Sequence, residues 1–188
     1  MSGGWAKDYN RAERLLWQDP RQIFSEIGLE PGQTLVDIGC GDGFFSIPAA
    51  KIVGRAGLVY ALDADTEALA VLSAKIKATD ITNIRPLLAD ATESLACVYG
   101  ADTVLLANVL HDFRCPLKVL ANIRQTLRPQ GLLADLDWKK EPQQLHGPPV
   151  ARRLNQEEAT ALIQQAGFKM IKSTTCGPFH YLLLAVPS

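Results

Sequence analysis

The sequence predicts an α/β fold in which a mostly parallel sheet carries helices on both faces and ends in an antiparallel hairpin. Short apolar runs alternate with amphipathic segments between residues 34 and 165, and this alternation is typical of strands joined by crossover helices. The first five runs each lead into a polar residue, usually an aspartate. The last two runs, over 169–175 and 181–186, are too close together for a crossover helix, so they are expected to pair as a hairpin.

The chain is long enough for one domain with a full core. It has 188 residues, of which 47% are hydrophobic and 21% charged, and its formal net charge is −1. We expect a helical arm or lid over residues 1–29 and a single globular domain over 30–188. Basic residues form runs only at the pairs 139–140 and 152–153, which argues against a nucleic-acid surface.

Membrane and redox signals are weak in this sequence. No apolar run approaches the ~20 residues that a spanning helix needs, so no membrane span is expected. The four cysteines form no C-x-x-C pair; they are Cys40, Cys97, Cys115 and Cys176. Their isolation argues against a zinc knuckle and suggests a reducing cytoplasm. A monomer and a homodimer are both compatible with these features.

The N-terminal arm is predicted to hold two short helices, over 12–17 and 21–27. Asp19 can cap the second helix, Pro20 fits its first position, and Gly28 fits the residue after its end. The aromatic residues of the arm are Trp5, Tyr9 and Trp17. These side chains either pack against the domain or close over a ligand as a lid, and the sequence supports both interpretations.

The core elements follow from the apolar pattern. The first strand begins at Thr34, and Pro48 must lie in or close to the first turn of the helix that follows. Further strands are predicted over 58–62, 84–89, 103–107 and 132–136. Helices are predicted over 44–53, 66–79, 116–127 and 156–165, the last capped by Asn155. The remaining segments are a short helix or turn over 92–98, a turn over 128–131 and a long loop over 138–153.

A glycine-rich turn follows the first strand, with Gly39, Gly41 and Gly43 at alternate positions. Glycines there let a ligand approach the backbone, and the N-terminus of the next helix points at that ligand. Such a turn alone fits nucleotide and dinucleotide binders alike. Asp37, just before the glycines, would repel a pyrophosphate but suits a cationic amino group.

Polar residues at the strand ends extend this site. Asp63, Asp90, Asn108 and Asp137 follow the next four predicted strands. In an open parallel sheet, ligands bind beyond the carboxyl ends of the strands. Asp63 lies ~20 residues after the glycines, where a carboxylate can accept both hydroxyls of a ribose. With Asp37, it predicts a ligand that has a ribose and a positive charge.

Four segments together resemble the class I S-adenosylmethionine-dependent methyltransferases. They are VDIGCGDG at 36–43, ALDAD at 61–65, LLADA at 87–91 and LRPQG at 127–131. The resemblance extends from about Leu35 to the C-terminus. It implies a Rossmann-like, seven-stranded sheet, S-adenosylmethionine as the cofactor and S-adenosylhomocysteine as the product.

The same resemblance implies cofactor-binding residues. They are Asp37, Gly39, Cys40, Gly41, Gly43, Asp63, Ala64, Asp90, Ala91 and Asn108. Asp37 matches the acid that supports the methionine amino group through the turn, and Asp63 matches the ribose carboxylate. Asp90 and the Ala91 amide match the adenine site. Asn108 falls beside the methionine moiety, although its side chain could instead cap the loop.

Within this class, the chain is similar to a branch that includes the ubiquinone/menaquinone C-methyltransferases (type 11) and the arsenite methyltransferases. The likeness rests on segment 135–141 and on Gly-Pro-Pro at 147–149. The cysteines lack the arrangement of arsenite methyltransferases, and Cys40 is expected to be structural. Asn108 is followed by Val-Leu-His-Asp rather than by the Pro-Pro-Tyr of enzymes that methylate nucleic-acid amino groups. A small-molecule acceptor is therefore expected.

Methyl transfer from a sulfonium is an in-line displacement that chiefly needs alignment and removal of water. A base is required only when the acceptor's nucleophile keeps a proton. His111 and Asp112 lie just past the fourth strand, so they are the predicted catalytic residues, with His111 as the base. A loop histidine that is merely bonded to Asp112 or to the backbone is the alternative. His146 and His180 are weaker candidates.

No metal site is expected. Asp112, Asp135 and Asp137 could be proposed as carboxylate ligands, but Asp135 lies away from the end of its strand.

Two other functions stay open. The chain could bind S-adenosylmethionine without turnover and rely on a partner for the substrate site. It could also be a nicotinamide-dependent reductase, although Asp37 and the presence of Phe44 instead of a glycine after Gly43 count against this.

Overall fold

The computed structural model describes residues 11–95, 98–142 and 146–188, so Trp5 and Tyr9 lie outside the described residues. A seven-stranded sheet has the strand order β3-β2-β1-β4-β5-β7-β6. Its strands are β1 (Thr34–Ile38), β2 (Leu58–Asp63), β3 (Ile84–Leu88), β4 (Ala101–Ala107), β5 (Leu127–Trp138), β6 (Phe168–Cys176) and β7 (His180–Pro187). Neighbouring strands from β3 to β5 are parallel, whereas β7 is antiparallel to β5 and β6. The predicted fold class and terminal hairpin are confirmed.

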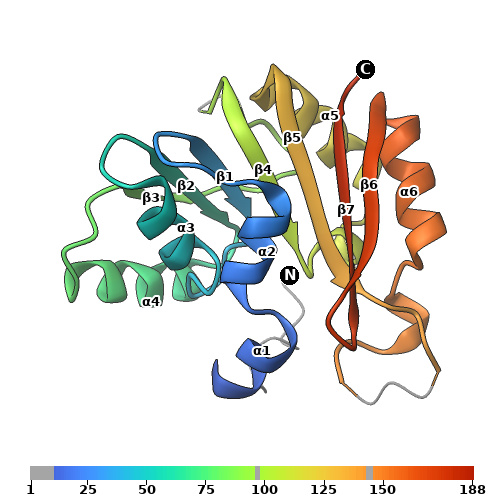
Figure 1. The fold of residues 1–188 in the computed structure, drawn as a ribbon, viewed down its shortest axis with the longest axis horizontal. Coiled ribbons are helices and arrows are strands. Elements are labelled where there is room, and N and C mark those ends of the chain that lie inside the picture. The colour runs from blue at the N-terminus through green and yellow to red at the C-terminus, as the bar shows by residue number, and fades with distance from the viewer. Residues whose placement is uncertain (1–10, 96–97, 143–145) are drawn as a thin grey trace.

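Helices cover both faces of this sheet (Figure 1). They are α1 (Arg11–Trp17), α2 (Pro20–Ile27), α3 (Ser46–Val53), α4 (Thr66–Lys77), α5 (Pro116–Thr126) and α6 (Gln156–Gln165), with short 3₁₀ helices η2 (Leu110–Asp112) and η3 (Val150–Arg152). In the described part of the chain, every helix is too short or too polar to cross a membrane. Figure 1 places α1 and the loop between β5 and α6 at the same edge, beyond the carboxyl end of β4.

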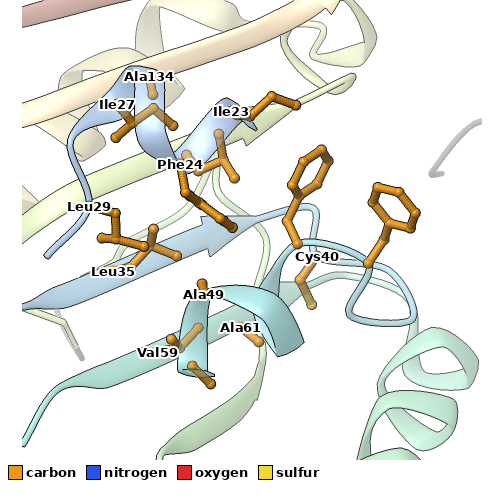
Figure 2. Close-up of a cluster of buried hydrophobic side chains, with 14 of the residues drawn as sticks. Ile23, Phe24, Ile27, Leu29, Leu35, Cys40, Ala49, Val59, Ala61 and Ala134 are labelled. Carbon is orange, nitrogen blue, oxygen red and sulfur yellow. The ribbon is translucent and has the colours of Figure 1, made fainter. Parts of the chain in front are cut away.

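The two faces hold two hydrophobic clusters. On one face, Ile23 and Phe24 of α2 and Ala49 of α3 pack over Leu35 of β1 and Val59 of β2 (Figure 2). All five are at most 1% exposed. On the opposite face, apolar side chains of α5 and α6 pack against β1, β4, β5 and β7. Burial on both faces explains why the strands read as nearly continuous apolar runs.

The predicted helix caps are present. The Asp19 side chain accepts a hydrogen bond from the Arg21 amide at 2.9 Å, and Gly28 ends α2 with a left-handed φ of 73°. Asn155 and Glu158 form a reciprocal capping box at the start of α6, with bonds of 2.7 and 2.8 Å. These local signals fix the helix boundaries.

Two predictions about elements are wrong. The helix predicted over 44–53 begins at Ser46, because Phe44 and Phe45 are buried in the turn at 3% and 4% exposure. For segment 92–98, which is predicted as a short helix or turn, the described residues begin with a turn, in agreement with the second alternative. The predicted turn over 128–131 belongs to β5, where the proline and glycine produce a shift in the register with β4 instead of a chain reversal.

Candidate active site

The glycine turn joins β1 to α3 at the carboxyl edge of the sheet. The amides of Gly39 and Cys40 both donate to the Leu62 carbonyl, at 2.8 and 3.0 Å, and the Gly43 amide donates to Cys40 at 3.0 Å. Gly41 has a left-handed φ of 54°, and a Cβ there would meet no described atom within 4 Å. The turn is therefore tied down along the sheet while Gly41 borders open space in which a ligand can approach the backbone.

Asp37 lies at the end of β1, below this turn. Its side chain is 1% exposed and accepts a hydrogen bond of 2.5 Å from the Ser46 hydroxyl. Burial, assisted by the charge of Asp63, raises the pKa of Asp37 to about 6 against the opposing effects of the Ser46 hydrogen bond and the charge of Arg14. No cationic side chain of the described residues forms an ion pair with Asp37. A cationic ligand group would supply the missing compensation.

Asp63 ends β2 beside the glycine turn. It is 7% exposed, and its Oδ2 accepts the Gly41 amide at 2.7 Å while its Oδ1 accepts the Asp65 amide at 2.9 Å. Ala64 follows it as an exposed residue. The two amides fix the carboxylate at the open edge, where a carboxylate can accept hydroxyl groups.

The turn after β3 lies next to this position, because the Ala89 amide donates to the Asp63 carbonyl at 3.0 Å. Asp90 is exposed and accepts the Thr92 hydroxyl at 2.7 Å and the Thr92 amide at 2.8 Å. These hydrogen bonds lower the pKa of Asp90. Ala91 is 5% exposed, and its carbonyl accepts the Asn122 amide group of α5 at 2.9 Å.

Asn108 follows β4 in a left-handed conformation with φ 59°. Its backbone amide donates to the Leu136 carbonyl at 2.7 Å, and its side-chain Nδ2 donates to Gln18 at 3.1 Å. The Asn108 Oδ1 is buried and has no hydrogen-bond partner among the residues that the structure describes. Gln18, only 1% exposed, joins this residue to the N-terminal segment. An unpaired buried carbonyl oxygen at this edge is available to a ligand N–H group.

His111 in η2 lies over the end of β5. Its Nδ1 is 2.7 Å from the Asp137 Oδ1, and its backbone amide donates to the Asp137 Oδ2 at 3.2 Å. The His111 side chain is 2% exposed. Burial disfavours the imidazolium, but the hydrogen bond to Asp137 and the charges of Asp137 and Asp112 outweigh it, so the pKa of His111 is raised. This arrangement directs Nδ1 toward Asp137, so that Nε2 is the ring nitrogen on the side of Asp112.

Asp112 lies on the other side of the ring, with its Oδ1 3.6 Å from the His111 Nε2. The same oxygen accepts Arg152 of η3 at 2.8 Å. The structure thus brings both predicted catalytic residues together, but the hydrogen-bond partner of His111 is Asp137 rather than its neighbour Asp112.

Asp135 belongs to the interior of β5. It is fully buried, and in the described part of the chain neither of its carboxyl oxygens has a hydrogen-bond partner. Burial and the charge of Asp137 raise the pKa of Asp135 well above its ordinary value, which favours the neutral form of this carboxyl group. Among the described residues, no group of three or more His, Cys, Asp and Glu side chains could hold a metal ion.

An aromatic cluster closes the edge beyond β5. Trp17 of α1 contacts three rings, with centroid separations of 4.8 Å to His146, 5.3 Å to Phe179 and 6.4 Å to Trp138. Arg153 is 2% exposed and donates to the carbonyls of Pro148, Lys139 and His146. The arm, the β5–α6 loop and the β6–β7 turn therefore form one packed wall.

His180, at the start of β7, is fully buried behind this wall. Its Nε2 is 2.6 Å from the Gln18 Nε2 and therefore accepts that N–H. Burial, assisted by the charges of Arg14, Lys139 and Arg153, lowers the pKa of His180 to about 3. His180 is neutral at physiological pH and joins the arm to the sheet.

The sequence predicted the turns that follow β1, β2 and β3, but it missed Asp137 as the partner of His111 and it missed Gln18 entirely. Asp137 carried a usable signal, since it ends the strand next to β4. A lone glutamine between two short helices carries none. Cys40, which is 6% exposed, is not a reactive thiol, because burial raises its pKa.

A family of proteins described as a methyltransferase domain matches residues 29–172. The chain therefore belongs to this methyltransferase domain family, and S-adenosylmethionine is its cofactor. The open space at Gly41, the buried Asp37 carboxyl group and the fixed Asp63 carboxylate fit a cationic ribonucleoside.

Three known proteins illustrate the likeness. A probable cobalt-precorrin-6B C(15)-methyltransferase (decarboxylating) from Methanosarcina acetivorans is 40% identical over 80 residues, which cover 43% of each chain. A ribosomal protein L11 methyltransferase from Caldanaerobacter subterraneus is 28% identical over 109 residues, covering 58% of this chain and 33% of that one. The match spans less than half the length of each of these relatives. The crystal structure of a SAM-dependent methyltransferase from Aquifex aeolicus superposes with a TM-score of 0.86 at 26% identity, over 96% of this chain and all of that one.

Proposed function

We propose that the protein transfers a methyl group from S-adenosylmethionine to a small-molecule acceptor, and that His111 accepts the acceptor's proton. The observation that carries this proposal is the 2.7 Å contact between the His111 Nδ1 and Asp137 at the sheet edge that also holds the glycine turn. When bound, the cofactor supplies an electrophilic methyl group on a good leaving group. The protein's tasks are then alignment, exclusion of water and acceptance of a proton.

The proposed donor site combines the turns after β1, β2 and β3. Asp37 would compensate the methionine ammonium group, because its buried carboxylate forms no ion pair with a cationic side chain of the described residues. Asp63 would accept the ribose hydroxyls, and the turn holding Asp90 would border the adenine. The other proposed contacts are Gly39, Cys40, Gly41, Gly43, Ala64, Ala91 and Asn108.

The proposed role of His111 follows from its tautomer. Because Nδ1–H donates to Asp137, Nε2 carries the lone pair that takes up the proton. The resulting imidazolium is stabilised by Asp137 and Asp112, whose charges raise the pKa of His111. Asp112 and Arg152 lie beside Nε2, so we assign Asp112 a positioning role.

A small acceptor is supported by the packing around His111. The arm, the β5–α6 loop and the β6–β7 turn are already in contact through Trp17, His146 and Phe179, which limits the space beside the donor site. The net charge of −1 offers no general attraction for nucleic acid.

We further propose carbon methylation of a conjugated acceptor, as in the ubiquinone/menaquinone branch that segment 135–141 resembles. A carbon acid must lose a proton, which gives the His111 and Asp137 pair a task. The archaeal relative is itself named as a C-methyltransferase.

Two binding and transfer measurements test the proposed function. Isothermal titration is expected to detect binding of S-adenosylhomocysteine and no binding of NAD. This result would distinguish a methyltransferase from a reductase. Incubation of the protein and labelled S-adenosylmethionine with a cell extract should then place label in the low-molecular-weight fraction.

The His111→Gln variant serves as the matched control and should bind S-adenosylhomocysteine while losing the transfer. Label in protein, as the L11-methylating relative would suggest, or in RNA would overturn the small-molecule proposal. Binding without transfer to any fraction would instead identify a module that depends on a partner.

A further inference from the structure

We propose that Arg14 of α1 binds the carboxylate of the donor's methionine moiety, so that α1 covers this part of the donor. This inference rests on the proposed donor site. It adds to that site a residue from a segment that precedes the first strand.

The position of α1 brings Arg14 to the glycine turn. Its guanidinium carbon lies 3.8 Å from the centroid of the Phe44 ring, just past Gly43. Arg14 also donates to Gln18 at 3.3 Å, and Gln18 accepts Asn108. The arm therefore connects the turn after β1 with the turn after β4, on the two sides of the proposed methionine position.

The charge on Arg14 lacks an acidic partner in the described part of the chain, where its polar contact is the neutral amide of Gln18. Burial lowers the pKa of Arg14 to about 10. Asp42 acts against this shift, but its carboxylate is paired with Lys75. A partly buried guanidinium beside a ligand turn, stacked on an aromatic ring and without a carboxylate, is arranged to receive an anion.

The charges of the proposed donor indicate which anionic group Arg14 would bind. The methionine moiety carries an ammonium and a carboxylate on one carbon. Asp37 suits the ammonium, whereas Asp42 and Asp63 would repel the carboxylate. Asp37 and Asp42 both raise the pKa of Arg14, so the guanidinium lies within electrostatic reach of the acids around the turn. Arg14 is thus positioned for the one donor group that these acids disfavour.

The test compares two ligands by isothermal titration. S-adenosylhomocysteine carries the carboxylate, and 5′-methylthioadenosine lacks the whole amino-acid part. Arg14→Ala is expected to lower the affinity for S-adenosylhomocysteine by about tenfold to hundredfold, as for the loss of a charge-assisted hydrogen bond. The affinity for 5′-methylthioadenosine should change by less than about twofold. Arg14→Lys should recover part of the loss.

Arg11→Ala is the matched control, because Arg11 lies one turn away on α1 and is 5.3 Å from the same ring centroid. It should leave both affinities unchanged. If Arg14→Ala lowers the affinity for both ligands equally, or for neither, this inference is overturned while the proposed donor site is unaffected. Failure of the wild-type protein to bind S-adenosylhomocysteine would overturn the donor site and this inference together.

Discussion

The proposed donor half of the site, formed by the turns after β1, β2 and β3, is built differently from the region formed by the ends of β4 and β5 with α1 and the β5–α6 loop. We call this second region the acceptor half, although its residues Arg14 and Asn108 are also proposed to contact the donor. In the donor half, hydrogen bonds join residues 9 and 22 positions apart, from Ser46 to Asp37 and from Gly41 to Asp63. In the acceptor half, Gln18 joins Asn108 and His180, which are 90 and 162 positions away. The donor half is thus a local structure, whereas the acceptor half requires the whole chain to be folded.

The largest expected effect is the loss of turnover without loss of cofactor binding when His111 in the acceptor half is replaced. His111→Gln should lower kcat by about 10²–10⁴, the usual contribution of a general base, while the affinity for S-adenosylhomocysteine stays within about twofold. Because His111 must be neutral to accept a proton and its pKa is raised, the wild-type rate should rise with pH through a value above about 6.5. The measurement is steady-state kinetics from pH 5 to 9, with His146→Gln as the control. Full activity of the His111→Gln variant would show that His111 is not the general base.

A second test concerns the burial of Asp37 in the donor half. Its folded-state pKa of about 6 exceeds the ordinary 3.8 by about two pH units, so ligand-free stability should fall as pH rises from about 4 to 6. At about 1.36 kcal/mol per pH unit, the loss amounts to about 3 kcal/mol. Asp37→Asn should therefore raise the free energy of unfolding above pH 6 and not below pH 4. The same substitution should weaken the binding of S-adenosylhomocysteine. Urea unfolding at pH 4, 5 and 7 checks this, and a difference independent of pH would contradict it.

Asp63 offers a direct test of the ribose assignment. Asp63→Ala should weaken the binding of S-adenosylhomocysteine by about 1–3 kcal/mol, because the ribose hydroxyl groups would lose their hydrogen-bond acceptor. Asp90→Ala is the comparison, with a smaller expected loss because Asp90 is exposed and bonded to Thr92. Isothermal titration measures both, and an unchanged dissociation constant for Asp63→Ala would refute the assignment.

The smallest expected effect comes from the ion pair between Arg152 and Asp112. The Arg152 side chain is 45% exposed, so Arg152→Ala should cost less than about 1 kcal/mol of stability. Its charge lowers the pKa of His111, so its removal should move the rising limb of the pH–rate profile to higher pH. Thermal unfolding and the same kinetic assay measure these changes. A shift to lower pH would show that Arg152 does not act on His111 through its charge.

The local parts of the molecule could be predicted from the sequence. Asp19 and Asn155 mark helix starts by hydrogen bonds within three residues, and the donor turns follow their strands directly. The partner of His111 could not be chosen in this way, because Asp112 is adjacent in sequence whereas Asp137 becomes adjacent only through the pairing of β4 with β5. Gln18 lacks any local pattern, since its role arises from burial between distant segments.

The direction of β7 determines where the acceptor half can be altered. Because β7 runs against β5, its first residue, His180, pairs with Trp138 at the end of β5. The β6–β7 turn, with Phe179 against Trp17, therefore borders the acceptor half although it lies more than 130 residues after the glycine turn. Libraries with varied length and composition in this turn would offer a route to altered acceptor selectivity in an engineered variant that retains its donor half unchanged.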